Sequence, residues 1–256
     1  MIFSNLVDAN LNTDFIGRNL EYYSRLASTN DEAWELIAEN VPNGSLIITD
    51  NQFKGRGRFG NKWISAPSMG LTFSLILYDL KNLHKLPLII GVSVCEALKE
   101  FNFKLKLKWP NDIILNDKKI GGILCELKKI NNVKTIVVGI GMNINEKADD
   151  FPDNLRKKAI SLSMVSNITY QRERVLAKIL NHFEKNLDLL KEKNLELFKN
   201  WESFCNHLNK EVTFNYNNVN VVGRFINISD EGNAIIEINK KQKTFSSGIV
   251  EINNTI

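Results

Sequence analysis

The chain has 256 residues, 43% of them hydrophobic and 24% charged, which suits one large soluble domain or a domain with a small appendix. Its formal net charge is +4 with acidic and basic residues interspersed, so charge alone does not indicate nucleic-acid binding. No run approaches the roughly 18 apolar residues that span a bilayer, and residues 1–12 do not resemble a signal peptide.

The reactive residue types are sparse. Three cysteines are widely spaced without a CxxC pair, as expected for reduced, mostly buried thiols in a cytoplasmic protein. Three isolated histidines give little support for a zinc site or a Ser–His triad.

The first 145 residues predict strands separated by two helices. One helix begins after Ser28, Thr29 and Asn30, whose hydroxyl and amide groups are typical helix caps. The other lies within 83–101 and begins near Pro87. Strands are predicted at 20–26, 45–50, 71–78, 105–108, 112–116, 119–130 and 133–145.

The last of these strands has two distinct faces. Isoleucine, valine and methionine alternate on one face, whereas Gly139, Gly141 and Asn143 lie on the other with Val137. Small residues leave room for a ligand or another backbone to approach the sheet. The structural alternative is a sheet that twists tightly under a helix.

The second half predicts a loop, two helices and a small β domain. Residues 151–167 predict a loop, whereas 172–191 and 195–204 carry helical patterns. Short strands at 212–216, 219–226, 234–238 and 244–252 indicate a small β-barrel. We therefore expect two domains, residues 1–208 and 209–256.

A basic glycine loop is the most informative local feature. Residues 54–63 hold three glycines and four cations and end on Trp63. Glycine lets the backbone approach a ligand closely, and successive backbone N–H groups can bind an anion. The planar guanidinium groups of Arg56 and Arg58 can each donate two hydrogen bonds to a carboxylate or phosphate. The pattern predicts a cover over an anionic small molecule, with Trp63 available to stack on a ring. A solvated basic loop and an RGG-like nucleic-acid segment are the alternatives.

A second basic cluster, Lys108–Asp112, is followed by Lys119. Asp112 offers a ligand for Mg²⁺ or a proton acceptor, and Lys119 offers a point charge for phosphate or carboxylate. A turn cap and a solvated lysine are the corresponding alternatives. The sequence contains neither a P-loop motif nor a Rossmann glycine turn. Two basic loops, a carboxylate and a glycine-faced strand suit a carboxylic acid held beside a nucleotide.

Four motifs in order resemble those of the biotin protein ligases: Gln52–Arg58 with Trp63, Lys108–Asp112, Lys119–Leu124 and Gly139–Asn143. Ser28-Thr29-Asn30 matches the family's early helix start. The resemblance is strong over about residues 18–145 and loose beyond. It implies an α+β fold, with a mixed β-sheet flanked by helices, like class II synthetases, and a C-terminal SH3-like β-barrel.

The resemblance also implies an activity. The family uses ATP and Mg²⁺ to convert biotin into biotinyl-5′-adenylate. It then transfers biotin to one lysine of a biotin carboxyl carrier protein, such as that of acetyl-CoA carboxylase. Family members occur as monomers and as homodimers.

Individual roles follow from the matched motifs. Residues that match biotin-binding positions are Ser28, Thr29, Asn30, Gln52, Gly55, Arg56, Lys119, Gly122, Gly139 and Gly141. Those that match ATP- or adenylate-binding positions are Arg56, Arg58, Trp63, Asn111, Lys119 and Asn143. The candidate catalytic residues are Arg56, Lys119 and Asp112, and Asp112 is also the candidate Mg²⁺ ligand.

Two features qualify the resemblance. Only 27 residues precede Ser28, too few for a winged helix-turn-helix domain, so we expect the monofunctional form that does not bind DNA. No arginine follows Gly248–Val250, which leaves the barrel's contacts to ATP or the acceptor open.

Two alternative functions remain. A lipoate or octanoate protein ligase or transferase of the same fold is disfavoured by Gln52, the Gly55–Arg58 loop and Trp63. A nucleic-acid-binding module is disfavoured by the scattered charge.

Overall fold

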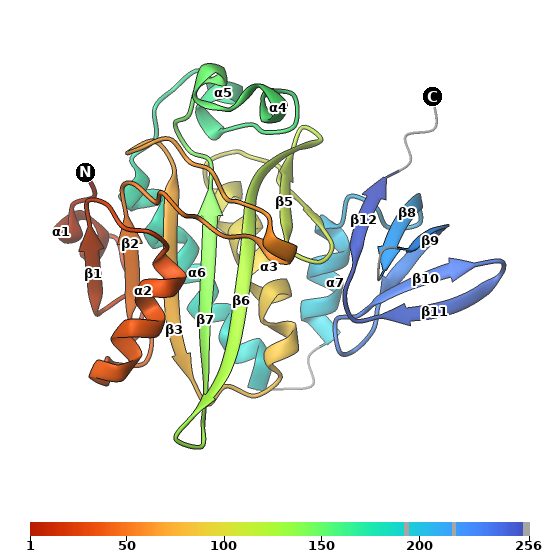
Figure 1. Ribbon diagram of the computed structural model, residues 1–256, viewed down its shortest axis with the longest axis horizontal. Helices are drawn as coiled ribbons and strands as arrows, with labels where there is room; N and C mark the ends of the chain where they lie inside the picture. Colours follow the sequence, from red (N-terminus) through yellow and green to blue (C-terminus); the bar gives the residue numbers. More distant parts are fainter. Residues whose placement is uncertain (192–194, 217–218, 253–256) are drawn as a thin grey trace.

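The computed structural model describes residues 1–191, 195–216 and 219–252 and contains two β-sheets (Figure 1). The larger sheet has seven strands in the order β1-β2-β3-β7-β6-β5-β4. Only β1 and β2 pair in parallel, so the sheet is mixed, as predicted. Its strands are β1 (Leu20–Tyr23), β2 (Leu46–Thr49), β3 (Leu71–Tyr78), β4 (Lys106–Lys108), β5 (Asp112–Leu115), β6 (Lys118–Ile130) and β7 (Val133–Met142).

Two long helices cover one face of this sheet. The helix α3 (Leu86–Lys99) is largely apolar because most of its residues are buried against the sheet and α6 (Arg172–Lys191), which lies beside it on the same face. Pro87 lies in its first turn, as the sequence predicts, where a missing N–H costs no hydrogen bond. The apolar residues of β3 and β7, including Leu75, Val138 and Ile140, pack on this side.

The opposite face is covered only in part. The helix α2 (Thr29–Leu36) packs Ala33 and Leu36 against Ile47, Ile76 and Val137. Beyond α2, the strands β6 and β7 carry glycines, and the loop of residues 50–70 crosses the sheet there. The alternation predicted for residues 133–145 therefore produces one buried apolar face and one face open to a ligand.

Residues 151–167 differ from the predicted loop. They contain two short helices, α4 (Asp153–Arg156) and α5 (Leu162–Ser166). The side chain of Ser161 caps α5 by accepting a hydrogen bond from Met164 N. A helix of four or five residues is too short to show helical periodicity, so the sequence pattern could not reveal it. The five-residue helix α1 (Ser4–Asp8) was likewise not predicted.

The C-terminal unit follows α7 (Leu195–Phe204) and is an antiparallel sheet in the order β11-β10-β9-β8-β12. Its strands are β8 (Glu211–Tyr216), β9 (Val219–Ile228), β10 (Ala234–Ile238), β11 (Lys241–Phe245) and β12 (Ile249–Ile252). It is consistent with an SH3-like domain, but the sheet does not close into a barrel over the described residues, because β11 and β12 form its two edges. The strand predicted over 244–252 is two strands, interrupted before Gly248, whose φ of 151° few other residues adopt.

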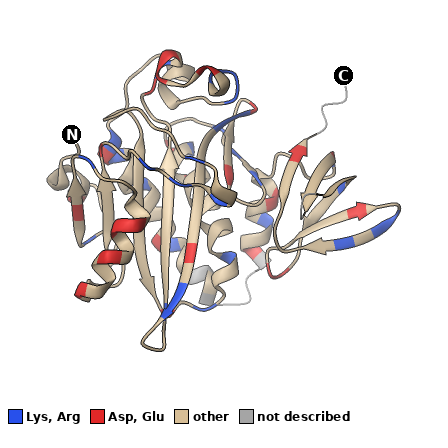
Figure 2. Ribbon diagram, in the orientation of Figure 1, with Lys and Arg blue, Asp and Glu red and all other residues tan. Residues whose placement is uncertain are grey.

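The surface charge is mixed. Over the described residues, Figure 2 shows acidic and basic positions interspersed along both sheets and the helices, with several acidic positions on α2. Within the described part of the chain, no helix is long and apolar enough to span a membrane. The three cysteines are free, and burial raises the pKa of both Cys125 and Cys205 to about 12.

Candidate active site

One cavity of about 170 Å³ brings most of the predicted site residues together. It lies where β6 begins and β7 ends, between the start of α2, the loop of residues 52–63 and the loop of residues 108–112. Gly55 and Asn143 lie outside its lining. The predicted residues that line it are Ser28, Thr29, Asn30, Gln52, Arg56, Arg58, Trp63, Asn111, Asp112, Lys119, Gly122, Gly139 and Gly141.

The floor of the cavity requires glycine. A Cβ atom on Gly139 would lie 2.2 Å from Asn30 Oδ1, and one on Gly141 would lie 2.3 Å from Cε2 of Trp63. Gly122 pairs with Gly141 across β6 and β7 and has more room, because its added Cβ would lie 3.4 Å from Lys119 Cε. The predicted glycine face is therefore the surface on which Asn30 and Trp63 lie.

A polar, uncharged end of the cavity is built by the start of α2. Ser28 caps the helix by accepting a hydrogen bond from Asp31 N at 3.4 Å. Thr29 N donates to Gln52 Oε1 at 2.8 Å, which fixes the side chain of Gln52 beside the helix. Both Thr29 and Gln52 are buried, so a ligand polar group that enters here must find partners among them.

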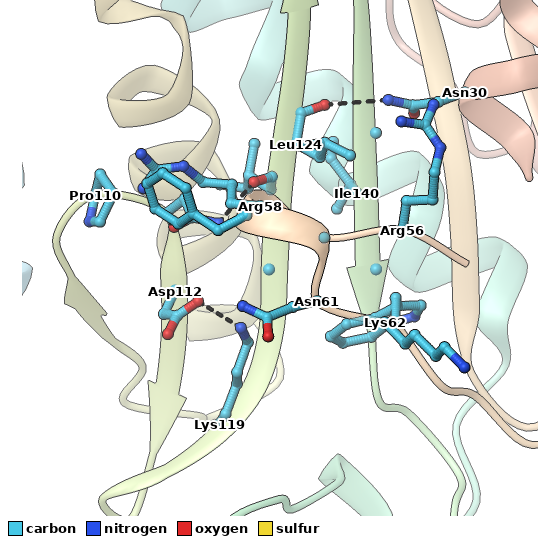
Figure 3. Close-up of a pocket in the computed structure, with 18 of the residues that line it drawn as sticks. Asn30, Arg56, Arg58, Asn61, Lys62, Pro110, Asp112, Lys119, Leu124 and Ile140 are labelled. Atoms are coloured by element: carbon cyan, nitrogen blue, oxygen red, sulfur yellow. Dashed lines mark hydrogen bonds and ion pairs between the residues drawn. The ribbon is translucent and has the colours of Figure 1, made fainter. Parts of the chain in front are cut away.

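Arg56 points toward α2 and away from Asp112 and Lys119 (Figure 3). Its Nη1 donates to Glu126 Oε1 at 2.9 Å, and its Nη2 donates to Asp31 Oδ1 at 2.5 Å. Glu126 also accepts from Asn30 Nδ2 at 2.8 Å and Trp34 Nε1 at 3.2 Å. Burial raises the pKa of Glu126, but the hydrogen bonds from Arg56, Asn30 and Trp34 outweigh it and hold this pKa below its ordinary value.

The opposite side of the cavity carries the other candidate catalytic groups. Lys119 Nζ donates to Asp112 Oδ1 at 2.5 Å, and Figure 3 shows the two side chains pointing toward each other. Arg58 Nη1 donates to Asn111 Oδ1 at 3.4 Å, and burial lowers the pKa of its guanidinium. Asn111 Nδ2 in turn donates to Ile123 O at 2.8 Å, so the loop of residues 108–112 is tied to β6.

Asp112 fits Mg²⁺ only as a single carboxylate ligand. Within the described residues, no three or more His, Cys, Asp or Glu side chains gather as a metal site. Mg²⁺ commonly binds through one or two carboxylates together with substrate phosphates, and Asp112 matches that pattern. Its oxygen also forms the ion pair with Lys119, so the same carboxylate positions this lysine.

The C-terminal sheet contributes directly to the cavity. Gly248, Ile249 and Val250, at the start of β12, line its wall. Trp109 is buried between the two units: its Nε1 donates to Gly232 O at 3.0 Å and its ring lies 6.0 Å from that of Phe214. The small domain therefore supports the loop that carries Asn111 and Asp112.

Asn143 lies behind the cavity. It is buried, and its Nδ2 donates to Ile160 O at 3.0 Å, while its Oδ1 has no hydrogen-bond partner among the described residues. Gly55 accepts a hydrogen bond from Trp63 N through its carbonyl oxygen at 3.0 Å, so it shapes the loop from outside the lining.

Sequence reasoning missed three polar partners of the site. Glu126 and Asp31 hold Arg56, and Ser74 lies within hydrogen-bond distance of both Thr29 and Asn30. Two signals were available. Ser74 interrupts an apolar strand opposite Gly139, and Glu126 occupies the same face of β6 as Gly122.

The chain matches two family descriptions. Residues 22–143 match the biotin/lipoate A/B protein ligase family, and residues 207–252 match the biotin protein ligase C-terminal domain. The bifunctional ligase/repressor BirA of Bacillus subtilis is 34% identical over 248 residues, covering 94% of this chain and 76% of that protein.

Solved structures of biotin protein ligases have a similar fold. The biotin protein ligase of Aquifex aeolicus, in complex with biotin and ATP, has a TM-score of 0.81 at 34% identity, covering 92% of this chain and 99% of that one. A biotin acetyl coenzyme A carboxylase synthetase of Helicobacter pylori has a TM-score of 0.60 at 27% identity, covering 88% and 99%. The chain belongs to the biotin/lipoate A/B protein ligase family, and both of its regions are those of a biotin protein ligase.

Proposed function

We propose that this protein activates biotin with ATP as biotinyl-5′-adenylate and then transfers biotin to a specific lysine of a biotin carboxyl carrier protein. The observation that carries the proposal is the division of one cavity into two chemically distinct ends. Thr29 and Gln52 line a neutral polar end suited to a ring with N–H and C=O groups. Lys119 and Arg58 line a cationic end suited to a carboxylate and a phosphate.

The first step brings two anions together. The biotin carboxylate attacks the α-phosphorus of ATP, an acyl phosphate bond forms, and pyrophosphate leaves with the bonding electrons. Lys119 and Arg58 stabilise the negative charge that gathers between the two reactants. Mg²⁺ held by Asp112 and the phosphates would add charge neutralisation when bound. A charge-assisted hydrogen bond is worth about 1.5–3 kcal/mol, so losing one lowers the rate by roughly tenfold to over a hundredfold.

The second step joins the activated acyl group to an amine. A neutral acceptor lysine attacks the mixed anhydride, an amide bond forms, AMP leaves, and the amine loses a proton. Asp112 lies on the cationic side and is our candidate for accepting or directing that proton. Trp63, whose indole packs against the glycine floor, and the loop of residues 54–63 shield the water-sensitive intermediate.

Arg56 has a different proposed role from Arg58. Two carboxylates neutralise its guanidinium on the α2 side of the cavity, so we assign it to positioning at the biotin end. The catalytic unit is proposed to span residues 1–208 and the supporting C-terminal unit 209–256, and the hydrogen bond from Trp109 Nε1 to Gly232 O is one polar link between them.

The decisive experiment is the exchange of labelled pyrophosphate into ATP, started by biotin, lipoate or octanoate in separate reactions. We expect exchange with biotin alone. Exchange with lipoate or octanoate but not with biotin would refute the proposal. The second step is then tested by mixing the isolated adenylate with a carrier domain whose acceptor lysine is intact or replaced, and only the intact domain should become labelled.

A further inference from the structure

One arginine joins the two ends of the loop that crosses the cavity. Arg172, the first residue of α6, is only 6% exposed. Its Nη2 donates to Asp50 Oδ1 at 2.7 Å, and its Nη1 donates to Gly70 O at 3.0 Å. Asp50 directly follows β2 and Gly70 directly precedes β3, so one guanidinium holds both ends of the segment between these strands. We call this segment, residues 51–69, the cover loop.

The ion pair between Arg172 and Asp50 is buried and charged. The Asp50 side chain is 8% exposed, and its Oδ2 accepts from Tyr22 OH at 2.6 Å and lies 3.2 Å from the exposed amino group of Met1. Burial raises the pKa of Asp50, but the hydrogen bonds from Tyr22 and Arg172 outweigh it and hold this pKa below its ordinary value. A buried pair is screened little by water and salt, so Arg172 holds Asp50 firmly.

The far end of the cover loop is fixed in one position. Ser68 N donates to Asp50 O at 2.8 Å, and Ser68 has a φ of 62°, a left-handed conformation that residues other than glycine rarely adopt. Such a conformation persists where the surrounding structure determines it strongly. A Cβ atom at Gly70 would overlap Glu146 Oε1, so the backbone at this end has no room to shift toward Glu146.

The start of the cover loop leads directly into the site. Gln52, two residues after Asp50, lines the cavity and accepts a hydrogen bond from Thr29 N at 2.8 Å. The middle of the loop carries Arg58 and Trp63, which also line the cavity. The position of these side chains over the cavity therefore depends on where the two ends of the loop are held.

Arg172 lies outside the lining of the cavity, and α6 lies on the face of the larger sheet opposite to the cover loop (Figure 1). We propose that Arg172 is a positioning residue: by joining both ends of the cover loop, it keeps the loop closed over biotinyl-adenylate. When the ends are fixed, fewer open conformations are available to the loop, so closing it over the ligand costs less conformational entropy. The inference rests on the proposed function for the identity of the ligand.

Two variants of Arg172 test this role in the full chain. Arg172→Met removes both bonds of the guanidinium, whereas Arg172→Lys keeps a cation beside Asp50 but offers one nitrogen in place of two. Two rates are measured for each protein: the dissociation rate of biotinyl-adenylate, and the rate of trypsin cleavage within the cover loop of the unliganded chain. Cleavage requires the loop to open, so its rate follows the population of the open loop. The trypsin sites in the loop are Lys54, Arg56, Arg58 and Lys62.

Two control variants separate this role from general stability. Tyr22→Phe removes a hydrogen bond to the same Asp50 carboxylate but leaves both bonds of Arg172 in place. Leu176→Ala, at a fully buried position of α6, creates a cavity in the core without removing a hydrogen bond at either end of the loop. All rates are compared at a temperature well below the unfolding midpoint of every variant.

We expect Arg172→Met to raise both rates by about two- to thirtyfold, the range found when a residue without ligand contact alters a distant site. Arg172→Lys should recover stability in urea but keep raised rates, and it carries the test alone if Arg172→Met does not fold. Both controls should keep the wild-type rates. Unchanged rates in the Arg172 variants, full recovery of both rates in Arg172→Lys, or an equal rise in Leu176→Ala would overturn the inference. A wild-type chain that forms no biotinyl-adenylate would overturn the proposed function, whereas trypsin cleavage of the unliganded chain would still test Arg172.

Discussion

Gly141 provides a sharp test of the glycine floor. Replacing it with alanine places a Cβ atom 2.3 Å from Cε2, 2.6 Å from Nε1 and 2.7 Å from Cζ2 of Trp63. Real Cβ contacts of this kind do not occur, so the indole must move by about an ångström or more. Gly122 lies opposite Gly141 in the sheet, and the nearest atom to its added Cβ is Cε of the flexible Lys119 side chain at 3.4 Å, with Trp63 Cζ3 in ordinary contact at 3.9 Å.

The pair of variants isolates the cost of the clash. Alanine gains about 0.5–1 kcal/mol over glycine inside a strand through its lower chain entropy, and that gain applies equally to both positions. Overpacking against a fixed neighbour costs about 1–3 kcal/mol. We therefore expect Gly141→Ala to be less stable than Gly122→Ala by about 1–3 kcal/mol.

Urea unfolding followed by circular dichroism measures this difference directly, provided that the free energy of unfolding falls with urea concentration at the same slope in both variants. Gly141→Ala should also bind biotinyl-adenylate more weakly, because the displaced indole of Trp63 intrudes on the cavity. Equal stability of the two variants would show that Trp63 does not lie on Gly141 and would refute our description of the floor.

Three further predictions concern Arg58, Trp109 and the buried carboxyl group of Glu146. Arg58→Gly should shorten retention of biotinyl-adenylate by tenfold or more, measured as its dissociation rate; an unchanged rate would exclude Arg58 from holding the intermediate. Trp109→Phe removes the hydrogen bond to Gly232 O and should raise the KM for ATP while the fold is kept, as judged by circular dichroism. Burial raises the pKa of Glu146 from its ordinary 4.5 to about 7. Between these two pH values the folded state holds a proton on Glu146 that the unfolded state has lost. The free energy of unfolding therefore falls as the pH rises from about 4.5 to 7. Glu146→Gln should flatten that slope in urea unfolding between about pH 5 and 7.

The sequence revealed the parts of the fold that depend on local pattern. The strand at 71–78 coincides with β3 because seven of its eight residues are buried and it reads as an apolar run bounded by turns. The two faces of residues 133–145 were correct because side chains alternate strictly along a strand. The cap at Ser28 was correct because its oxygen satisfies a local N–H group of α2.

Other features depend on contacts between distant segments and left no local pattern. Glu126 matters because the fold brings Asn30 and Trp34 of α2, and Arg56 of the loop, to its carboxylate. The place of β12 in the cavity wall follows from the docking of the C-terminal sheet, which the sequence of Gly248–Val250 does not encode locally. The local sequence pattern shows which residues are buried, whereas the topology of the fold determines which distant residues they contact.

The two arginines of the loop, identical in the sequence pattern, are separated by their electrostatic surroundings. Arg56 lies between two carboxylates, so its charge is largely compensated on the side of α2. Arg58 is partly buried, and among the described residues no carboxylate lies within 4.0 Å of its guanidinium nitrogens. A partly desolvated cation without a carboxylate partner attracts an incoming phosphate more strongly than a compensated one. We therefore propose that Arg58 is the arginine that holds the adenylate, whereas Arg56 organises the biotin end of the cavity.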